Sequence, residues 1–483
     1  MRRNKAAVLL IGIPLAAVMA TSSTWAATLV SGPSPFASCT IGGSSTGTNY
    51  VNAEVEPWLA VNPHDPTNLI GAWQQDRWSD GGAHGLVAGF SFDGGNTWGE
   101  APLPFSACAP GTPAALQYER ASDPWVSVGP DGTAYTVSIS FNASNNNNAV
   151  AAAVSRNGGQ TWDNVNVLLA DNEPTAQFFN DKESVTANPF RAGEAYAVWD
   201  RLESPNDNPY ANLHTAAFRG PTFFSKTVDG GRTWSSPKII VNFTSSRHQT
   251  IGNQIVVDPR TGTLYDFFSL FTPPFNLSAY KVAFIKSTDD GATWTPPQII
   301  ADLRTVTVTD PNTGEPLRTG DIIPEPAIDP ATGQLYVVWQ DSRFNGGLFD
   351  EIALSTSTDG GNSWSTSIRV NTPKGRPAFN PSVRVNSAGT VAVTYYDFRN
   401  LPAGDTTTLP TDIWLTSSTN HGQSFGNELH VAGSFNMKTA PISRGFFVGD
   451  YQGLDVRGTA FVPFFVQTNS GNTANRTDVF AAP

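Results

Sequence analysis

The stretch Ser91-Phe-Asp-Gly-Gly-Asn-Thr-Trp98 decides the fold, because close variants of it occur six times along the chain. The copies begin at Ser91, Ser155, Thr227, Ser287, Ser357 and Ser418. Their third positions, 93, 157, 229, 289, 359 and 420, are 64, 72, 60, 70 and 61 residues apart. A repeat of this length, built from short apolar stretches between turns, indicates a radial or stacked all-β architecture.

Four strands are expected around each copy of the motif. An apolar strand opens with an acidic or amide residue, as at Glu56-Pro-Trp and Asp123-Pro-Trp, and a turn rich in Pro, Asp and Gly follows it. A second strand and a third strand that runs into the motif follow. A fourth strand after the motif, such as 238–241, completes the unit. Four strands per unit is typical of a β-propeller blade.

The opening of the first strand recurs a seventh time at Asp450-Tyr-Gln, followed by two more apolar stretches before the chain stops. The strand that this last unit lacks is available at the other end of the chain, at 28–34. We therefore predict a seven-bladed propeller closed by an N-terminal strand, which leaves no sheet edge exposed.

Residues 1–26 have the pattern of a signal peptide, with Arg2, Arg3 and Lys5 before an apolar run and small residues before a cleavage point. We expect 27–483 to form one exported, monomeric domain without a membrane span. Removing the segment changes the formal charge from −12 to −15, which argues against nucleic acid as a partner. In an exported protein Cys39 and Cys108 are expected to form a disulfide, and free buried thiols are the alternative.

The motif itself is expected to be structural. Its Asp or Asn accepts hydrogen bonds from backbone N–H groups in a turn, and its Gly takes a positive φ. Asn157 and Asn420 show that the charge is dispensable. A calcium loop needs several carboxylates at fixed spacing, which the motif lacks, so no metal is expected.

Two charged sets are predicted to meet at one end of the propeller, because antiparallel strands bring the starts of first strands beside the ends of second strands. The strand-opening set is Glu56, Asp123, Glu183, Glu325 and Asp450, with Gln254 and Asn380 in the remaining two blades. The strand-ending set is Asp76-Arg77, Asp200-Arg201, Asp341-Ser-Arg343 and Asp397-Phe-Arg399. Pairs repeated in several blades are equally well explained as bridges between blades, so residues that occur once, Arg120, His248, Arg444 and Tyr451 among them, are the stronger functional candidates.

The motif series resembles the Asp-box, or bacterial neuraminidase, repeat of the sialidase-like superfamily over nearly all of 27–483. The resemblance implies a propeller that acts on or binds carbohydrate. Sialidases of this kind hold the substrate carboxylate with three arginines and use an acid/base residue and a tyrosine nucleophile assisted by a glutamate. The chain has Glu56-Pro-Trp where that family has an early Arg-Ile-Pro signature. Those sialidases have six blades, so six is the alternative to the seven counted here.

The resulting hypothesis is a secreted, sialidase-like glycoside hydrolase acting on an acidic extracellular glycan without a cofactor. Tyr451 beside Asp450 is the candidate nucleophile. The acid/base candidates are Glu56, Asp76, Asp123, Glu183 and Glu325. The candidate substrate-binding residues are Arg77, Arg120, Arg201, Arg343, Arg399, Arg444 and His248. A non-catalytic propeller that binds glycan or protein is the first alternative, and a polysaccharide lyase is the second.

Overall fold

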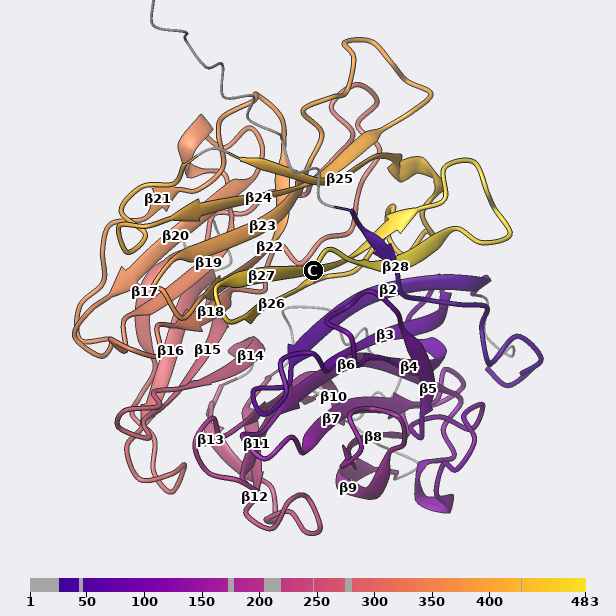
Figure 1. Ribbon diagram of the computed structural model, residues 1–483, viewed down its shortest axis with the longest axis vertical. Helices are drawn as coiled ribbons and strands as arrows, with labels where there is room; N and C mark the ends of the chain where they lie inside the picture. Colours follow the sequence, from indigo (N-terminus) through magenta and orange to yellow (C-terminus); the bar gives the residue numbers. More distant parts are fainter. Residues whose placement is uncertain are drawn as a thin grey trace, which may run out of the picture.

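A computed structural model describes residues 26–42, 47–172, 178–203, 219–245, 247–273, 280–426 and 428–483 (Figure 1). Apart from Ala26, the predicted signal peptide lies outside these residues. Within the described ranges the helical content is three 3-10 turns, at Ala114–Leu116, Arg343–Asn345 and Met437–Thr439, and the rest is strand and loop. None of these helices is long and apolar enough to cross a bilayer. The all-β prediction is confirmed.

The strands pair into five sheets, one of twelve strands (β1–β9 and β26–β28) and four of four strands. Along the chain they are described below as seven consecutive groups, of which the first, second and last belong to the twelve-stranded sheet. The first three are β2 (Asn49–Val61), β3 (Leu69–Trp78), β4 (Ala83–Ser91) and β5 (Gly99–Leu103); β6 (Arg120–Val128), β7 (Ala134–Phe141), β8 (Asn148–Ser155) and β9 (Asp163–Asp171); and β10 (Phe178–Ala187), β11 (Ala195–Glu203), β12 (Thr222–Thr227) and β13 (Lys238–Val241).

The next three groups have the same four-stranded antiparallel order. They are β14 (Gln249–Val257), β15 (Leu264–Phe271), β16 (Tyr280–Ser287) and β17 (Gln298–Asp302); β18 (Glu325–Ile328), β19 (Leu335–Asp341), β20 (Glu351–Ser357) and β21 (Ile368–Arg369); and β22 (Ala378–Val385), β23 (Val391–Asp397), β24 (Pro410–Ser418) and β25 (Leu429–Asn436). The last group is β26 (Gly453–Arg457), β27 (Ala460–Thr468), β28 (Thr477–Ala481) and the N-terminal β1 (Thr28–Leu29).

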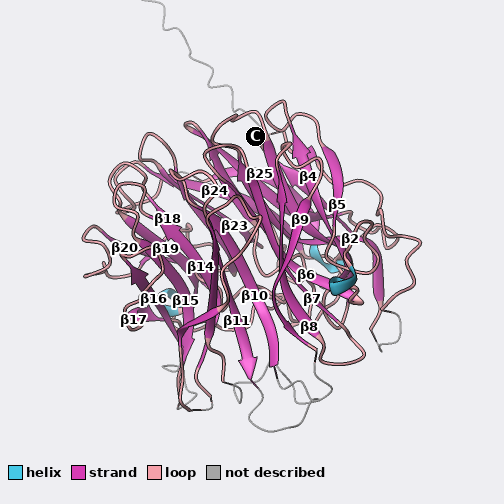
Figure 2. Ribbon diagram, turned by 90° about the horizontal axis from the view of Figure 1, so that it is seen from below, coloured by secondary structure: helices cyan, strands magenta, loops and turns pink. Residues whose placement is uncertain are grey.

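The first strands of the groups form a closed ring. Contacts run from β2 to β6, β10, β14, β18, β22 and β26 in turn, and β26 contacts β2 again. In Figure 1 the end of the chain, in yellow, accordingly lies beside its beginning, in indigo. Figure 2 shows the strands running between two rims of loops.

Burial is greatest in the middle strands of the groups and least in the outermost ones. Strands β3 and β8 are buried along their whole length, on both faces. The outermost strands β13 and β17 are mostly half-buried, and Ile239 and Ile299 on them are exposed. Each sheet therefore packs its two faces against neighbouring groups while its outer edge meets solvent.

The repeated turn joins the third and fourth strands of six groups and is held by its own side chains. In the first copy Asp93 accepts hydrogen bonds from the Thr97 N–H (2.9 Å) and the Thr97 hydroxyl (2.7 Å). Ser91 Oγ accepts from the Gly95 N–H at 2.9 Å, and Gly94 and Gly95 have φ of 76° and 95°. In the copy with Asn157, the amide nitrogen donates to the Thr161 hydroxyl at 2.9 Å, so the same turn forms without a charge. These bonds agree with the structural interpretation of the motif.

The two ends of the chain meet at the last group. Strand β1 pairs antiparallel with β28, Thr28 facing Ala481 and Leu29 facing Phe480, as the closure prediction requires. Cys39 and Cys108 form a disulfide with their Cα atoms 5.7 Å apart, so the predicted pairing is confirmed. The bond ties the segment after β1 to the segment after β5.

Candidate active site

A cavity of about 560 Å³ opens where the first strands begin and the second strands end. Asp123 of β6 and Lys182 of β10 contribute from strand openings, and Arg77 of β3 contributes from a strand end. Two long segments without regular strands complete the wall. They are residues 317–323, between β17 and β18, and residues 443–450, between β25 and β26.

Three arginines line this cavity: Arg77, Arg318 and Arg444. The guanidinium groups of Arg77 and Arg318 lie over the Phe447 ring, 4.8 and 4.5 Å from its centroid, and each donates to Ser443 Oγ at 3.3 Å. Burial, and then the charge of Arg318, lower the pKa of Arg77 to about 10. The two cations are thus held side by side by an aromatic ring and a shared hydroxyl.

Asp450 fixes the orientation of Arg318. Arg318 Nε donates to Asp450 Oδ1 at 3.0 Å, and a terminal nitrogen of the same guanidinium donates to Oδ2. Although burial opposes ionisation of both groups, their mutual attraction lowers the pKa of Asp450 and raises that of Arg318. Arg444 stands at the mouth, exposed, in a left-handed backbone conformation (φ 63°). It therefore remains accessible to a ligand that enters the cavity.

Two half-buried carboxyl groups lie in the same cavity wall as these cations. Burial, and then the charge of Asp123, raise the pKa of Asp181 to about 7. Burial, and then Asp350, raise the pKa of Asp321 to about 7. Both residues line the cavity. An acid that is protonated near neutral pH and lies close to an ionised carboxylate is the usual requirement for general acid/base catalysis.

Lys182 is an unusual cation in the cavity wall. It is 4% exposed, and its Nζ lies 4.3 Å from the ring centroid of Trp125 and 4.1 Å from that of Tyr451. No hydrogen-bond acceptor contacts this Nζ among the residues that the structure describes. Two aromatic faces therefore stabilise the ammonium group, while its N–H donors remain unused.

Five of the first strands carry a left-handed residue at a β-bulge. These residues are Glu56 (φ 57°), Asp123 (56°), Lys182 (44°), Gly252 (75°) and Asn380 (49°), each at or next to a register shift. The bulge lets the strand turn a side chain inward that regular alternation would direct elsewhere. Of these five residues, Asp123 and Lys182 line the cavity.

No protein-family model matches this sequence, and no curated protein matches it. Among solved structures, the chain is similar to the Hadza microbial sialidase Hz136, with a TM-score of 0.48, 14% identity, and coverage of 87% of this chain and 74% of that one. It is also similar to an α-L-arabinanase of Penicillium chrysogenum, with a TM-score of 0.44, 12% identity and coverage of 90% and 98%. For a mutant NanB sialidase of Streptococcus pneumoniae the TM-score is 0.43, the identity 13% and the coverage 91% and 69%.

At two positions the structure differs from the predicted set of strand-opening acids. Lys182, not Glu183, occupies the bulge of β10, and both side-chain oxygens of Glu183 are buried without a hydrogen-bond partner among the described residues. Glu325 accepts from Ser382 Oγ (2.7 Å) and Arg384 (2.8 Å), and Arg384 lines a separate cavity of about 280 Å³ toward the other end of the first strands. Aligning on acidic residues alone missed the bulge, which a following proline marks only at Glu56, Asp123 and Asn380.

Three of the four repeated arginines belong to the framework. Arg201 donates to Asp171 at 3.1 and 2.5 Å, Arg343 pairs with Asp341 at 2.7 Å, and Arg399 bonds both Asp397 and Glu428. None of the three lines the larger cavity. The Arg201–Asp171 pair joins two neighbouring groups, as the bridging alternative predicts, whereas the ion pairs of Arg343 and Arg399 lie within one group.

Glu56 lies outside the cavity wall, where it is buried and accepts a hydrogen bond from Gln74 Nε2, and so do four further candidates. Asp76 is buried and accepts from Asn52 N–H, Ser34 Oγ and His84 Nδ1, which secures the N-terminal segment. Arg120 is buried against the Trp78 ring and bonds Asp80 at 2.7 Å. His248 stacks on Phe243.

Tyr451 is the fourth of these candidates, and aromatic rings surround it. It contacts Trp58 and Trp125 and donates its hydroxyl hydrogen to the Pro124 carbonyl at 3.3 Å. Burial, and then the charge of Glu56, raise the pKa of its phenol well above the usual value. These contacts fit a packing role rather than that of an exposed nucleophile.

Sequence reasoning missed Arg318, Asp181, Lys182 and Asp321. Arg318 and Asp321 lie in the 303–324 segment, which is longer than the other segments that join consecutive groups of described strands. That extra length was the available signal, because shorter segments join the other groups. Asp181 and Lys182 directly precede Glu183. Glu183 is followed by Ser184, whereas Glu56 and Asp123 are followed by proline, and this difference was the local sign that Glu183 is not the equivalent residue.

Proposed function

We propose that the seven strand groups are the blades of a seven-bladed β-propeller, and that the protein is an exported glycoside hydrolase acting on an acidic glycan. The cyclic contacts of the first strands support the propeller. The disulfide supports an oxidising location. The observation that carries the function is the gathering of Arg77, Arg318 and Arg444 in one cavity with two carboxyl groups, Asp123 and Asp181.

In this proposal the guanidinium groups bind the carboxylate of the sugar. Arg318 is held by Asp450 and presents its remaining N–H groups beside Ser443, while Arg444 contacts the ligand from the mouth. Forked guanidinium groups suit a planar carboxylate better than ammonium groups do. Asp181 is the candidate proton donor to the leaving oxygen, and Asp123 is the candidate base or nucleophile, in the usual two-carboxylate scheme.

The experiment compares turnover of a fluorogenic sialoside and a panel of uronate polymers by the wild type and two variants. Asp181→Asn should lower kcat at least about 100-fold, because it removes the proton donor. Glu325→Gln is the matched control, since burial also raises the pKa of Glu325 to about 7, but outside this cavity. Equal losses in both variants, or turnover that Asp181→Asn leaves intact, would contradict the assignment.

A non-catalytic glycan-binding propeller is the second candidate. The observation that favours it is the position of Tyr451, packed between rings and absent from the cavity wall. Binding of an acidic glycan without turnover of any substrate in the panel would support this alternative against the hydrolase.

A further inference from the structure

Residues 303–324, called the strap below, connect β17 to β18 by a detour across the molecule. The strap forms a short two-stranded excursion, in which Thr309 bridges Pro316 and the Leu317 N–H donates to the Val308 carbonyl at 2.9 Å. Leu303, Val308 and Leu317 of the strap are buried. The strap is thus packed against the ring rather than extended into solvent.

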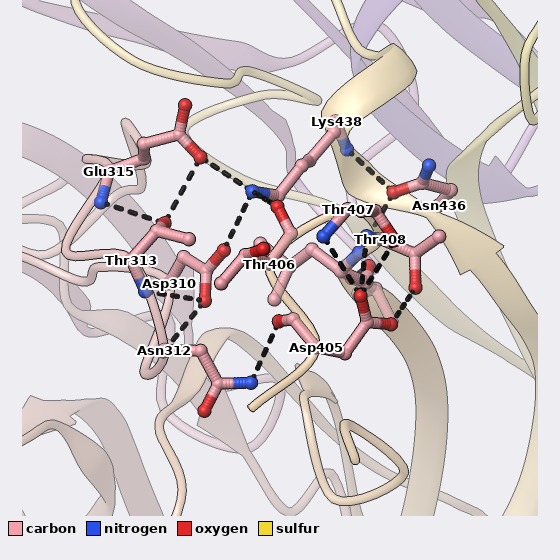
Figure 3. A network of polar contacts seen from close by, with 12 residues as sticks. Asp310, Asn312, Thr313, Glu315, Asp405, Thr406, Thr407, Thr408, Asn436 and Lys438 are labelled. Atoms are coloured by element: carbon pink, nitrogen blue, oxygen red, sulfur yellow. Dashed lines mark hydrogen bonds and ion pairs between the residues drawn. The ribbon is translucent and has the colours of Figure 1, made fainter. Parts of the chain in front are cut away.

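Lys438, in the 3-10 turn after β25, holds the far turn of the strap (Figure 3). Its Nζ lies 3.0 Å from Asp310 Oδ2 and 2.5 Å from Glu315 Oε2, and donates to the Thr406 carbonyl at 3.0 Å. Asp310 is 1% exposed, so this pair is shielded from water on the strap side. One ammonium group therefore joins two carboxylates of the strap to the segment between β23 and β24.

The contacts of Lys438 with Asp310 and Glu315 are called the clamp below, and a second set of contacts strengthens it. The Asn312 side chain donates to the Pro402 carbonyl at 2.9 Å and to the Asp405 carbonyl at 2.8 Å. Asp405 in turn accepts from the Thr407 and Thr408 backbone N–H groups, which fixes the loop that receives Asn312 (Figure 3). The turn of the strap is therefore anchored to a loop that is itself ordered by hydrogen bonds.

The clamp lies only three residues before Arg318. The Arg318 N–H donates to the Phe446 carbonyl at 3.0 Å, and the Phe446 N–H donates to the Pro316 carbonyl at 3.1 Å. Gly445 allows this approach, because a Cβ there would lie 2.6 Å from the Pro316 carbonyl oxygen. The backbone that carries Arg318 thus docks on the segment that carries Ser443 and Arg444.

We propose that Lys438 is a positioning residue for the anion-binding cavity: by clamping Asp310 and Glu315 it holds the strap so that Arg318 reaches Ser443 and Asp450. The inference rests on the proposed function, in that Arg318 binds the acidic group of the ligand. Lys438 itself does not line the cavity. Its effect on the ligand is transmitted through the strap.

The kinetic test uses the acidic substrate that the wild type turns over and the methyl ester of the same substrate. Lys438→Met should raise KM for the acid about tenfold with little change in kcat, because a displaced cation weakens binding of the anion. KM for the uncharged ester should not change. Lys438→Arg should restore the KM for the acid, and the double variant with Arg318→Met should be no worse than Arg318→Met alone.

The matched control is Lys226→Met. Lys226 pairs with Asp290 at 2.6 Å and also donates to a carbonyl, but it lies beside the repeated turns, outside the cavity wall. This variant should leave both KM values unchanged. Equal effects of Lys438→Met on acid and ester, or additive effects in the double variant, would overturn the proposal while leaving the proposed function intact.

Hydrogen exchange tests the clamp without any substrate. In Lys438→Met the amides of Leu317, Arg318 and Phe446 should exchange at least about tenfold faster than in the wild type, because they lose their shared anchor. In Lys226→Met their exchange should be unchanged. Unchanged exchange in Lys438→Met would refute the clamp, whereas the absence of turnover and of acid binding in the wild type would refute the proposed function alone.

Discussion

The spacing between aspartate and arginine decides which repeated arginines pair with their own aspartate. In Asp341-Ser-Arg343 and Asp397-Phe-Arg399 the two side chains are two residues apart and form ion pairs with each other. Directly adjacent residues on a strand point to opposite faces. Arg201 and Arg77 follow their aspartates directly, so each must find another partner. Arg201 finds Asp171, whereas Arg77 is directed to Ser443 and the cavity.

Replacing a framework arginine and a cavity arginine should separate stability from binding. Arg201→Met leaves Asp171 without its ion pair and should lower the free energy of unfolding by about 2 kcal/mol, between the values typical of exposed and buried pairs. Arg444→Met should change it by less than about 0.5 kcal/mol, since Arg444 is exposed. Denaturant unfolding of both variants measures these changes in the free energy of unfolding.

The same two variants should show the reverse order in binding. Arg444→Met should raise KM for an acidic substrate about tenfold, because a charge-assisted hydrogen bond is lost. Arg201→Met should leave KM unchanged. A larger KM effect in Arg201→Met than in Arg444→Met would place the binding site elsewhere.

The raised pKa of Asp181 predicts the alkaline side of the pH–rate profile. With a pKa of about 7, Asp181 is protonated in acid and loses its proton as the pH rises, so kcat/KM should fall about tenfold per pH unit above 7. Asp181→Asn should abolish this limb, whereas Glu325→Gln should retain it. A limb that persists in Asp181→Asn would assign the acid to another group.

The sign of the linked stability effect is opposite to that of an ordinary salt-bridged aspartate. Because folding raises the pKa of Asp181 from about 4 to about 7, the folded state binds the proton more tightly. The stabilisation from this group is fully present below pH 4 and is lost as the pH rises through 7. The pH–rate profile is therefore measured well below the unfolding temperature at every pH.

At the level of residues, the sequence predicted only some of the side chains that line the cavity. Arg77, Asp123 and Arg444 were identified because they end a strand, open a strand or occur once. Lys182 was missed because its neighbour Glu183 matches the acidic pattern. A β-bulge shifts the inward position by one residue, and residue type alone does not reveal that shift.

At the scale of elements, the repeated turn is a local structure that its own sequence encodes. Its bonds join residues two to four positions apart, such as Ser91 to Asp93 and Asp93 to Thr97, so each copy can form independently of the others. This explains why the motif was sufficient to predict the order of the strands around it. The far turn of the strap is the opposite case, because the bonds that anchor it to Pro402, Asp405 and Lys438 join residues 90 or more positions apart, which no local sequence pattern predicts.

Substitution in one repeated turn should show that geometry matters more than charge. Asp93→Ala removes the acceptor of the Asn96 and Thr97 N–H groups and should lower the thermal midpoint by about 1–3 °C. Asp93→Asn should lower it by less than half as much, because Asn157 supports the same turn. Calorimetry of the two variants makes the comparison, and equal losses would show that the carboxylate charge itself is required.

At the scale of the whole molecule, stability depends on closing the ring. The first and last groups touch through contacts of β2 with β26, β27 and β28, among them the single pairing of Ala53 with Thr477, and β1 completes the last group by pairing with β28. Strand β1 has only two residues, so its own hydrogen bonds are few. The disulfide compensates by fixing the segment that follows β1 to the neighbouring group.

Removing the disulfide should therefore destabilise the closure. Cys39 and Cys108 are 69 residues apart, and the loop-entropy relation assigns about 4 kcal/mol to a bond that closes such a loop. The variant with both cysteines replaced by serine should unfold at lower urea concentration by that amount, with an unchanged denaturant slope if the native surface is preserved. Hydrogen exchange should quicken first in β1 and β28, because β1 has lost its tether.

Reductant provides the control that separates the bond from the substitutions. The wild type treated with reductant should match the double-serine variant, and the variant itself should not respond to reductant. If the reduced wild type kept its urea midpoint, closure would rest on the contacts of β2 with β26 and β28 alone. The N-terminal strand would then contribute little to the stability of the closed ring, and its predicted role in closing the ring would be wrong.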